Sequence, residues 1–164
     1  MTPHRPFADA QAARAAIALA TPAIRKALQR PGVSFKKTLH LVVLDPAARP
    51  GLSRFEDALM VEASIGDRRQ WDADYAAFAR DKALLSWRHG MDSRHAVQQE
   101  PHGLLHHETV LWGGVWLDGL VVAASGAAPD WDEAFSLSVA GYLRALTAER
   151  PLGMPVALAQ AAQT

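Results

Sequence analysis

Three segments of the chain place hydrophobic residues at the spacing of a helix. The first runs from about Ala8 to Arg30, and its apolar residues recur every three or four positions, at Ala13, Ile17, Ala20, Ile24 and Leu28. Thr21 and Pro22 lie in its middle and have the residue types of a helix N-cap and first turn. The segment therefore predicts either two short helices or one kinked helix.

The second helical segment runs from Gln70 to about Gly90, and the third begins near Asp130. One face of the second carries the apolar residues Trp71, Tyr75, Phe78 and Leu85, together with the polar residues Lys82 and His89. The buried stripe of the third consists of Phe135, Val139, Leu143 and Leu146. Asp130 and Glu133 have the spacing of a capping box, and Pro151 ends this helix.

Two pairs of segments have the patterns of strands. Thr38–Leu44 and Phe55–Ile65 are joined by a stretch rich in proline and glycine, which predicts a hairpin. Glu108–Trp116 and Leu120–Ser125 form the second pair, and Asp-Gly in the turn between them is a strong hairpin signal. Met91–Leu105 is expected to be a polar loop.

The order of these elements is α-β-β-α-β-β-α. Hairpin connections favour an antiparallel sheet, and the alternation of strand and helix that a parallel sheet needs is missing. We therefore expect an α+β fold in which helices flank an antiparallel sheet. The length of 164 residues fits a single domain over residues 1–164, with flexible termini at residues 1–7 and 152–164.

The composition restricts the chemistry and the location that we expect. The chain has no cysteine, so thiol catalysis, iron–sulfur clusters and zinc–thiolate sites are excluded. Its apolar stretches are too short to cross a membrane, and the N-terminus lacks the apolar core of a signal peptide. We expect a cytoplasmic protein that has no membrane partner.

The formal net charge is zero, but the charges are separated along the chain. Residues 1–54 carry nine Lys and Arg against two Asp, whereas residues 55–164 carry eight Lys and Arg against fifteen acidic residues. The basic first third indicates an anionic partner, a contact between copies of the chain, or a solvated helix face. Aromatic residues are not interleaved with these cations, so a nucleic-acid partner is not expected.

Histidine supplies the first group of candidate functional residues. His95, His102, His106 and His107 lie within thirteen residues, and imidazole is a common metal ligand. Without thiols, a metal here would need histidine and carboxylate ligands, and haem would need one axial imidazole. His102, His106 and His107 are the metal-ligand candidates, and the alternative is that they are solvated loop side chains.

Lys82 is the second candidate, because it lies between Phe78 and Leu85 on an apolar helix face. Such a lysine must extend to solvent, pair with an acidic residue, or approach an anionic ligand. Gly113 and Gly114 lie within a predicted strand pair, which indicates a bulge or a close backbone approach to a ligand. The chain lacks the phosphate-binding loop, nucleophile elbow and zinc-protease motifs, so an enzyme is the least favoured class and no catalytic residue is assigned.

Residues 80–145 carry motifs that resemble the haem-degrading-domain family, which includes GlcG, HbpS and the C-terminal domain of PduO. The motifs are Lys82-Ala83, Gly113-Gly114-Val115-Trp116, Asp118-Gly119, Ser125-Gly126 and Asp132-Glu133. The five residues between Ser125-Gly126 and Asp132 agree with the family spacing. Two positions depart from its pattern: Trp116 replaces a proline, and Ala124 replaces a glycine.

This resemblance implies a profilin-like sheet flanked by helices, assembly into homo-oligomers, and binding of haem or a related tetrapyrrole. We therefore expect a small-ligand-binding protein of this family, with Lys82, His89, Gly113, Gly114 and Ser125 around the ligand. The alternative is a homo-oligomeric assembly or interaction protein that binds no cofactor.

Overall fold

The sheet is antiparallel, as the sequence predicts. The structure, a computed structural model, describes residues 8–149. Its four strands are β1 (Leu39–Leu44), β2 (Leu59–Ile65), β3 (Gly114–Leu117) and β4 (Leu120–Ser125), in the order β2-β1-β4-β3. Each neighbouring pair is antiparallel, and Asp118 and Gly119 both have positive φ in the β3–β4 turn.

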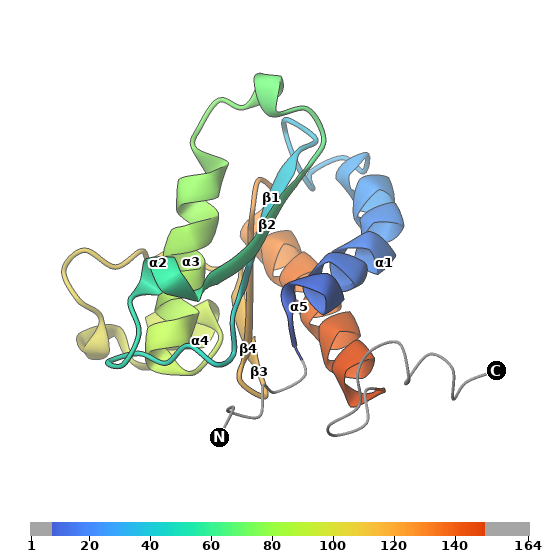
Figure 1. Cartoon of the computed structure of the whole chain (residues 1–164). Coiled ribbons are helices and arrows are strands. Elements are labelled where there is room, and N and C mark those ends of the chain that lie inside the picture. Colours follow the sequence, from blue (N-terminus) through green and yellow to red (C-terminus); the bar gives the residue numbers. More distant parts are fainter. Residues whose placement is uncertain (1–7, 150–164) are drawn as a thin grey trace.

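Helices cover both faces of this sheet. Helices α1 (Ala10–Leu28) and α5 (Pro129–Ala148) lie together on one face, and α3 (Tyr75–His89) lies on the other (Figure 1). Shorter helical segments are α2 (Phe55–Ala58), α4 (Ser93–Gln99) and two 3₁₀ turns at Arg68–Gln70 and Pro101–Gly103. The expected α+β fold, with helices flanking an antiparallel sheet, is confirmed.

The core has two parts because side chains along a strand alternate between the faces of the sheet. Leu41 and Val43 of β1 join the large cluster beneath α1 and α5, whereas Val42 and Leu44 join the smaller cluster beneath α3. All six residues of β1 are buried. This fully buried strand, apolar except for His40, is the centre on which both helical layers pack.

The first helix is continuous, so of the two alternatives that the sequence leaves open the structure excludes two short helices. Asp9 caps its N-terminus by accepting a hydrogen bond from the backbone N–H of Ala12 at 2.8 Å. Pro22 lies inside the helix, and the hydroxyl of Thr21 donates to the carbonyl of Ile17 at 2.7 Å rather than capping a new helix. The predicted buried residues from Ala13 to Leu28 all lie in the core.

Two predicted boundaries on either side of β2 were wrong. Residues 55–58 form α2 rather than strand, because Glu56 and Asp57 are acidic residues in a first helical turn. Helix α3 begins at Tyr75 rather than Gln70, since Asp74 caps it by accepting from the N–H of Ala77 at 3.0 Å. Trp71 precedes the helix and donates its indole N–H to Thr38 Oγ1, just before β1, at 2.9 Å.

The region between α3 and α5 also differs from prediction. The expected loop at residues 91–105 contains α4 and a 3₁₀ turn, and β3 begins only at Gly114 rather than Glu108. The predicted capping box is absent, because Glu133 pairs with Arg94 and the helix begins at Pro129. The predicted stripe of α5 is correct at Phe135, Val139 and Leu143, and Leu146 is partly buried.

Two expectations bear on the ends of the chain and on membranes. The termini expected to be flexible, residues 1–7 and 152–164, lie outside the described residues. Within residues 8–149, none of the helices combines the length and the apolar character that a membrane crossing requires.

Candidate functional site

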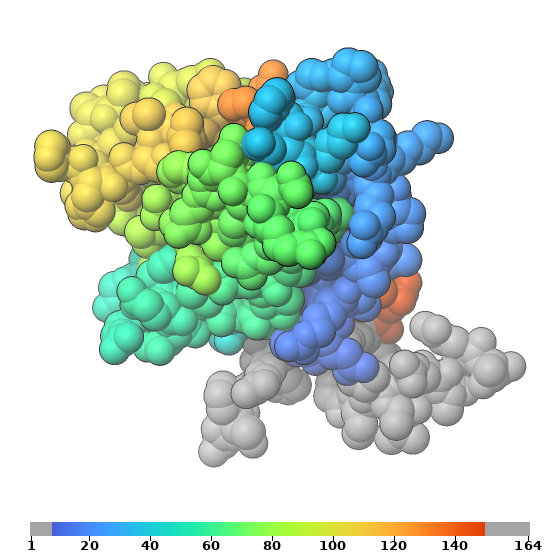
Figure 2. Space-filling view, turned by 90° about the horizontal axis from the view of Figure 1, so that it is seen from above, coloured from blue at the N-terminus to red at the C-terminus, as the bar shows by residue number. Residues whose placement is uncertain are grey.

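A cavity of about 430 Å³ opens where β4 ends and α5 begins. Its walls come from the loop after α1, from α3, from the segment before β3, and from the β4–α5 connection. Figure 2 views the face where the first three of these segments meet, coloured blue to cyan, green, and yellow to orange. We call it the aromatic cavity because its walls include Phe35, Tyr75, Phe78 and Trp112.

A buried ion pair between Lys82 and Asp132 lies in the wall of the aromatic cavity. Lys82 extends from α3 and Asp132 from the first turns of α5, so the pair joins the helical layers on opposite faces of the sheet. Lys82 Nζ lies 2.8 Å from Asp132 Oδ2, and the side chains are 4% and 2% exposed. Of the three roles that the sequence leaves open for Lys82, the structure shows the acidic partner.

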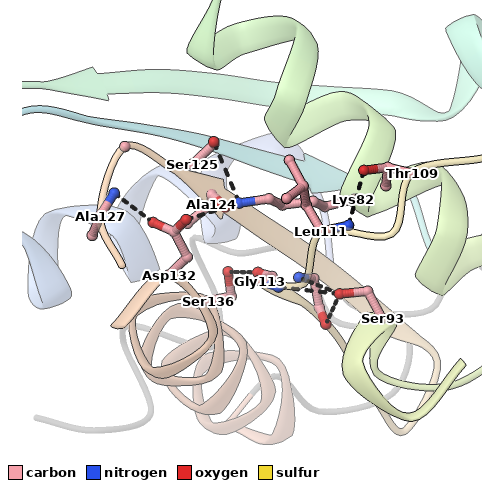
Figure 3. A network of polar contacts seen from close by, with 12 residues as sticks. Lys82, Ser93, Thr109, Leu111, Gly113, Ala124, Ser125, Ala127, Asp132 and Ser136 are labelled. Atoms are coloured by element: carbon pink, nitrogen blue, oxygen red, sulfur yellow. Dashed lines mark hydrogen bonds and ion pairs between the residues drawn. The ribbon is translucent and has the colours of Figure 1, made fainter. Parts of the chain in front are cut away.

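The hydrogen bonds of the Lys82 ammonium group are fully used by the protein. Its Nζ donates to Asp132 Oδ2 at 2.8 Å, to the Ala124 carbonyl at 3.0 Å and to Ser125 Oγ at 3.3 Å (Figure 3). An ammonium group has three hydrogens, so no donor remains for a ligand carboxylate. Ser125 uses its oxygen as an acceptor here, which leaves its own O–H available to a molecule in the cavity.

The carboxyl group of Asp132 is tuned by two opposing effects. Burial raises the pKa of Asp132 to about 6, although the neighbouring Lys82 ammonium lowers it. The backbone N–H of Ala127 also donates to Oδ1 at 2.9 Å. A carboxyl group in a cavity wall whose pKa lies near neutrality can change its charge under physiological conditions, and such groups are candidate functional residues.

Gly113 and Gly114 let the backbone approach this ion pair closely. Gly113 has a φ of +136°, and a Cβ there would lie 2.8 Å from Asp132 Cβ and 3.1 Å from Lys82 Nζ. A Cβ on Gly114 would lie 2.6 Å from the Lys82 carbonyl oxygen and 2.7 Å from Ser86 Oγ. The sequence predicts a bulge or a close backbone approach to a ligand here; in the structure the close neighbours of this backbone are the ion pair and α3.

Two serines hold the Gly113–Gly114 backbone in place. Ser93 Oγ at the start of α4 accepts from the N–H groups of Gly113 at 3.1 Å and Gly114 at 3.0 Å. Ser136 Oγ of α5 donates to the Gly113 carbonyl at 2.6 Å (Figure 3). The backbone beside the ion pair is therefore bound from both α4 and α5.

The wall also contains a donor that the protein does not use. Trp112 Nε1 is buried and lacks a hydrogen-bond acceptor among the described residues. Most buried polar groups in proteins are paired, so this indole N–H departs from the usual pattern; the nitrogen is itself inaccessible to solvent and is not a contact point on the cavity surface.

His89 is not part of the aromatic cavity. Its Nε2 lies 3.2 Å from Glu108 Oε2, and Arg88 binds both oxygens of the same carboxylate. The backbone N–H of Leu105 donates to Glu108 at 2.8 Å, and these hydrogen bonds, Arg88 foremost, lower the pKa of Glu108 to about 2. This cluster fastens the segment before β3 to α3, which accounts for the shorter strand.

The candidate metal ligands His102, His106 and His107 are exposed and do not line the aromatic cavity. Within residues 8–149, there is no group of three histidine, aspartate or glutamate residues that could hold a metal ion. Among residues 8–149, none of those that line the aromatic cavity carries an imidazole. The residues around this cavity therefore do not fit a haem with an axial histidine, and we assign no haem chemistry to it.

A second polar cluster, which sequence reasoning missed, lies on the β1–β2 pair. His40 is 3% exposed, and its Nδ1 and Nε2 lie 2.8 Å from Ser64 Oγ and 3.2 Å from Glu62 Oε1. Arg80 of α3 binds both oxygens of Glu62. Both ring nitrogens are occupied by protein groups, so His40 serves to join β1, β2 and α3 rather than to bind a metal.

The site could be predicted from sequence only in part. Lys82, Gly113, Gly114 and Ser125 meet at the ion pair, whereas Asp132 entered only as a family motif. Because Asp132 is fifty positions from Lys82, no local pattern connects the two residues. The sequence signal that singled out Asp132 was its spacing after Ser125-Gly126, which is part of the family resemblance.

Comparisons with known proteins do not identify a family for this chain. Neither a scan against models of protein families nor a search of curated proteins finds a match. The resemblance to the haem-degrading-domain family therefore stays a prediction from residues 80–145.

Proposed function

We propose that this chain is a small-ligand-binding protein and that its ligand occupies the aromatic cavity. The observation that carries the proposal is the combination of a cavity of about 430 Å³, aromatic walls and a buried ion pair in one wall. Ligand sites are concave, mostly apolar, and contain a few polar groups that fix orientation. The cavity meets each of these conditions.

The polar groups restrict the part of a ligand that can lie at the ion pair. The ammonium of Lys82 and the carboxylate of Asp132 neutralise each other, and the ammonium has no hydrogen left to donate. The O–H of Ser125 is a donor in the wall that a ligand can use. The cavity therefore suits an aromatic or apolar group with a neutral hydrogen-bond acceptor.

The test uses N-phenylnaphthylamine, an uncharged aromatic dye whose fluorescence rises in apolar surroundings. We expect saturable binding of one dye per chain. Replacement of Phe35, which is 89% exposed at the cavity, by Phe35→Ser should raise the Kd about three- to tenfold through loss of an aromatic contact.

The matched control is Leu52→Ser. Leu52 is also a large apolar residue, 85% exposed, and it does not line the cavity. The Kd should not change in this variant. Equal effects of the two substitutions, or dye uptake that does not saturate, would contradict the proposal.

Two further expectations from the sequence need their own measurements. Hemin titration tests haem binding: a saturable Soret shift that is lost when His102, His106 and His107 are changed to alanine would establish it. Hemin binding that is the same in the wild type and in these alanine variants would exclude the three histidines as haem ligands. Assembly into homo-oligomers is tested by the mass of the protein in solution at low and high salt.

A further inference from the structure

A second hollow adjoins the aromatic cavity. Its volume is about 420 Å³, and it shares Gly32, Ser34 and Phe35 with the aromatic cavity. The remaining lining residues are Gln29, Arg30, Pro31 and Lys37. We call it the basic hollow because its charged lining residues, Arg30 and Lys37, are both cations.

The cations of the basic hollow are not neutralised by the protein. Among residues 8–149, no carboxylate lies within 4.0 Å of Arg30 or Lys37, although ten ion pairs form elsewhere. Arg30 instead lies over the ring of Trp131, with its guanidinium carbon 5.4 Å from the ring centroid. Both cations are exposed and can contact a bound anion.

The surrounding sequence adds to the positive potential at this place. Residues 25–37 contain five Lys and Arg and no acidic residue, which makes this segment the densest part of the basic first third. Lys36 lies over the ring of Phe35, with Nζ 5.1 Å from the centroid. Phe35 thus lies between aromatic walls on one side and a run of cations on the other.

We propose that the ligand is an aromatic anion, whose ring system lies in the aromatic cavity and whose charged group lies against Arg30 and Lys37 in the basic hollow. This inference rests on the proposed function and adds the chemical class of the ligand. The two ends of the site differ in charge. The buried ion pair at one end has no net charge, whereas the unpaired cations at the other end attract an anionic group. The charged group is therefore at the exposed end, where its hydration is partly kept.

The experiment compares two dyes that differ by one anionic group. Anilinonaphthalene sulfonate is N-phenylnaphthylamine with an added sulfonate, so the ratio of their Kd values reports the contribution of the anion. We expect the sulfonate to bind about five- to tenfold more tightly at low salt, because each exposed ion pair contributes modestly. The advantage should shrink between about 20 mM and about 500 mM salt, since screening weakens exposed charge pairs.

Variants locate the anionic group. Arg30→Gln with Lys37→Gln should remove the advantage of the sulfonate and leave the Kd of the uncharged dye unchanged. The control, Arg25→Gln with Lys26→Gln, removes the same charge from exposed residues of α1 that do not line either hollow, and should keep most of the advantage.

The outcomes separate this inference from the proposed function. Equal binding of the two dyes, with Phe35→Ser weakening both, would overturn the anion subsite and leave the aromatic cavity as a ligand site. Loss of the advantage in both double variants alike would show a general effect of charge, and would also overturn the subsite. Failure of both dyes to bind would overturn the proposed function and this inference together.

Discussion

The buried ion pair makes a prediction about stability that can be worked out from its geometry. Two unit charges 2.8 Å apart attract by about 6 kcal/mol at an effective dielectric constant of about 20. The burial of both groups opposes this attraction, so the net contribution of the pair is small. Removal of one partner is different, because the other charge stays buried without compensation.

We therefore expect Lys82→Met and Asp132→Asn each to lower the free energy of unfolding by about 3–5 kcal/mol at neutral pH. The double variant should cost much less than the sum of the two, since neither buried charge remains. Urea unfolding of the wild type, both single variants and the double variant gives a coupling free energy, which we expect to be about 3 kcal/mol or more.

The cost of Lys82→Met should depend on pH in a defined direction. The pKa of Asp132 is already raised in the folded protein, to about 6 from 3.8, and loss of the ammonium removes an effect that lowers it. A carboxyl group with a raised folded pKa contributes stability below its unfolded pKa and loses it as pH rises through the folded pKa. A folded pKa of about 6 by itself makes the wild type about 1.4 kcal/mol less stable at pH 8 than at pH 5. The higher pKa of Asp132 in Lys82→Met should make this loss larger, so the cost of the substitution relative to wild type should grow from pH 5 to pH 8.

Glu133→Gln is the control, because Glu133 neighbours Asp132 and pairs with Arg94 in a partly exposed position. It should cost less than about 1 kcal/mol. Additive effects of the two single variants, or a cost of Lys82→Met that is the same at pH 5 and pH 8, would refute the reasoning.

Three further predictions concern the backbone and the two polar clusters. Gly113→Ala should lower the free energy of unfolding by about 2–4 kcal/mol, because its φ is +136° and its Cβ would lie 2.8 Å from that of Asp132. Gly141→Ala, in α5 with open space around it, should raise the free energy by about 0.5–1 kcal/mol, and a loss at both glycines would contradict the account. Burial lowers the pKa of His40, so its contribution to stability is present above the unfolded pKa of about 6.5 and is lost as pH falls through the folded value. His40→Gln should flatten the fall in urea midpoint between pH 7 and pH 5, and an unchanged slope would exclude His40 as its source. The pKa of Glu108 is lowered to about 2, so Glu108→Gln should lower the free energy of unfolding by about 1–3 kcal/mol at pH 7 and by little at pH 2. Thermal unfolding at the two pH values measures this difference. Equal losses at both would contradict a stabilising role of the Glu108 carboxylate.

The sequence predicts the parts of the fold that depend on strong local patterns. The buried strand predicted at Thr38–Leu44 is β1 to within one residue, and the Asp118-Gly119 turn and the stripe of α5 also agree with the structure. Each depends on residues within one element or on two adjacent turn residues. For these elements, hydrophobic periodicity and the residue types of the turn are sufficient to predict the structure.

The buried face of α3 could be identified only in part. Leu85 and Lys82 of the predicted face are buried, but Phe78 is 38% exposed at the cavity, and small residues such as Ala79 and Ala83 pack against the sheet. A helix that packs closely on a sheet favours small side chains at the contact. A prediction of the buried face from large hydrophobic residues alone therefore misses the alanines that make this contact. Lys82 is buried on that face only because Asp132 meets it from across the sheet.

The histidines show the opposite error. His102, His106 and His107 are close in sequence, but they are exposed and form no common site with a carboxylate within the described part of the chain. His40 stands alone in sequence, yet it is buried in a hydrogen-bonded cluster. Proximity along the chain does not replace proximity in the fold.

The most direct test of a ligand site in the aromatic cavity uses the indole N–H signals of the five tryptophans. Trp112 lines the cavity, whereas Trp87 donates its indole N–H to the Ala48 carbonyl and lies outside it. Titration with N-phenylnaphthylamine, followed by proton–nitrogen NMR, should shift the Trp112 signal to saturation and leave that of Trp87 in place. A saturating shift at Trp87 with none at Trp112 would contradict the central claim.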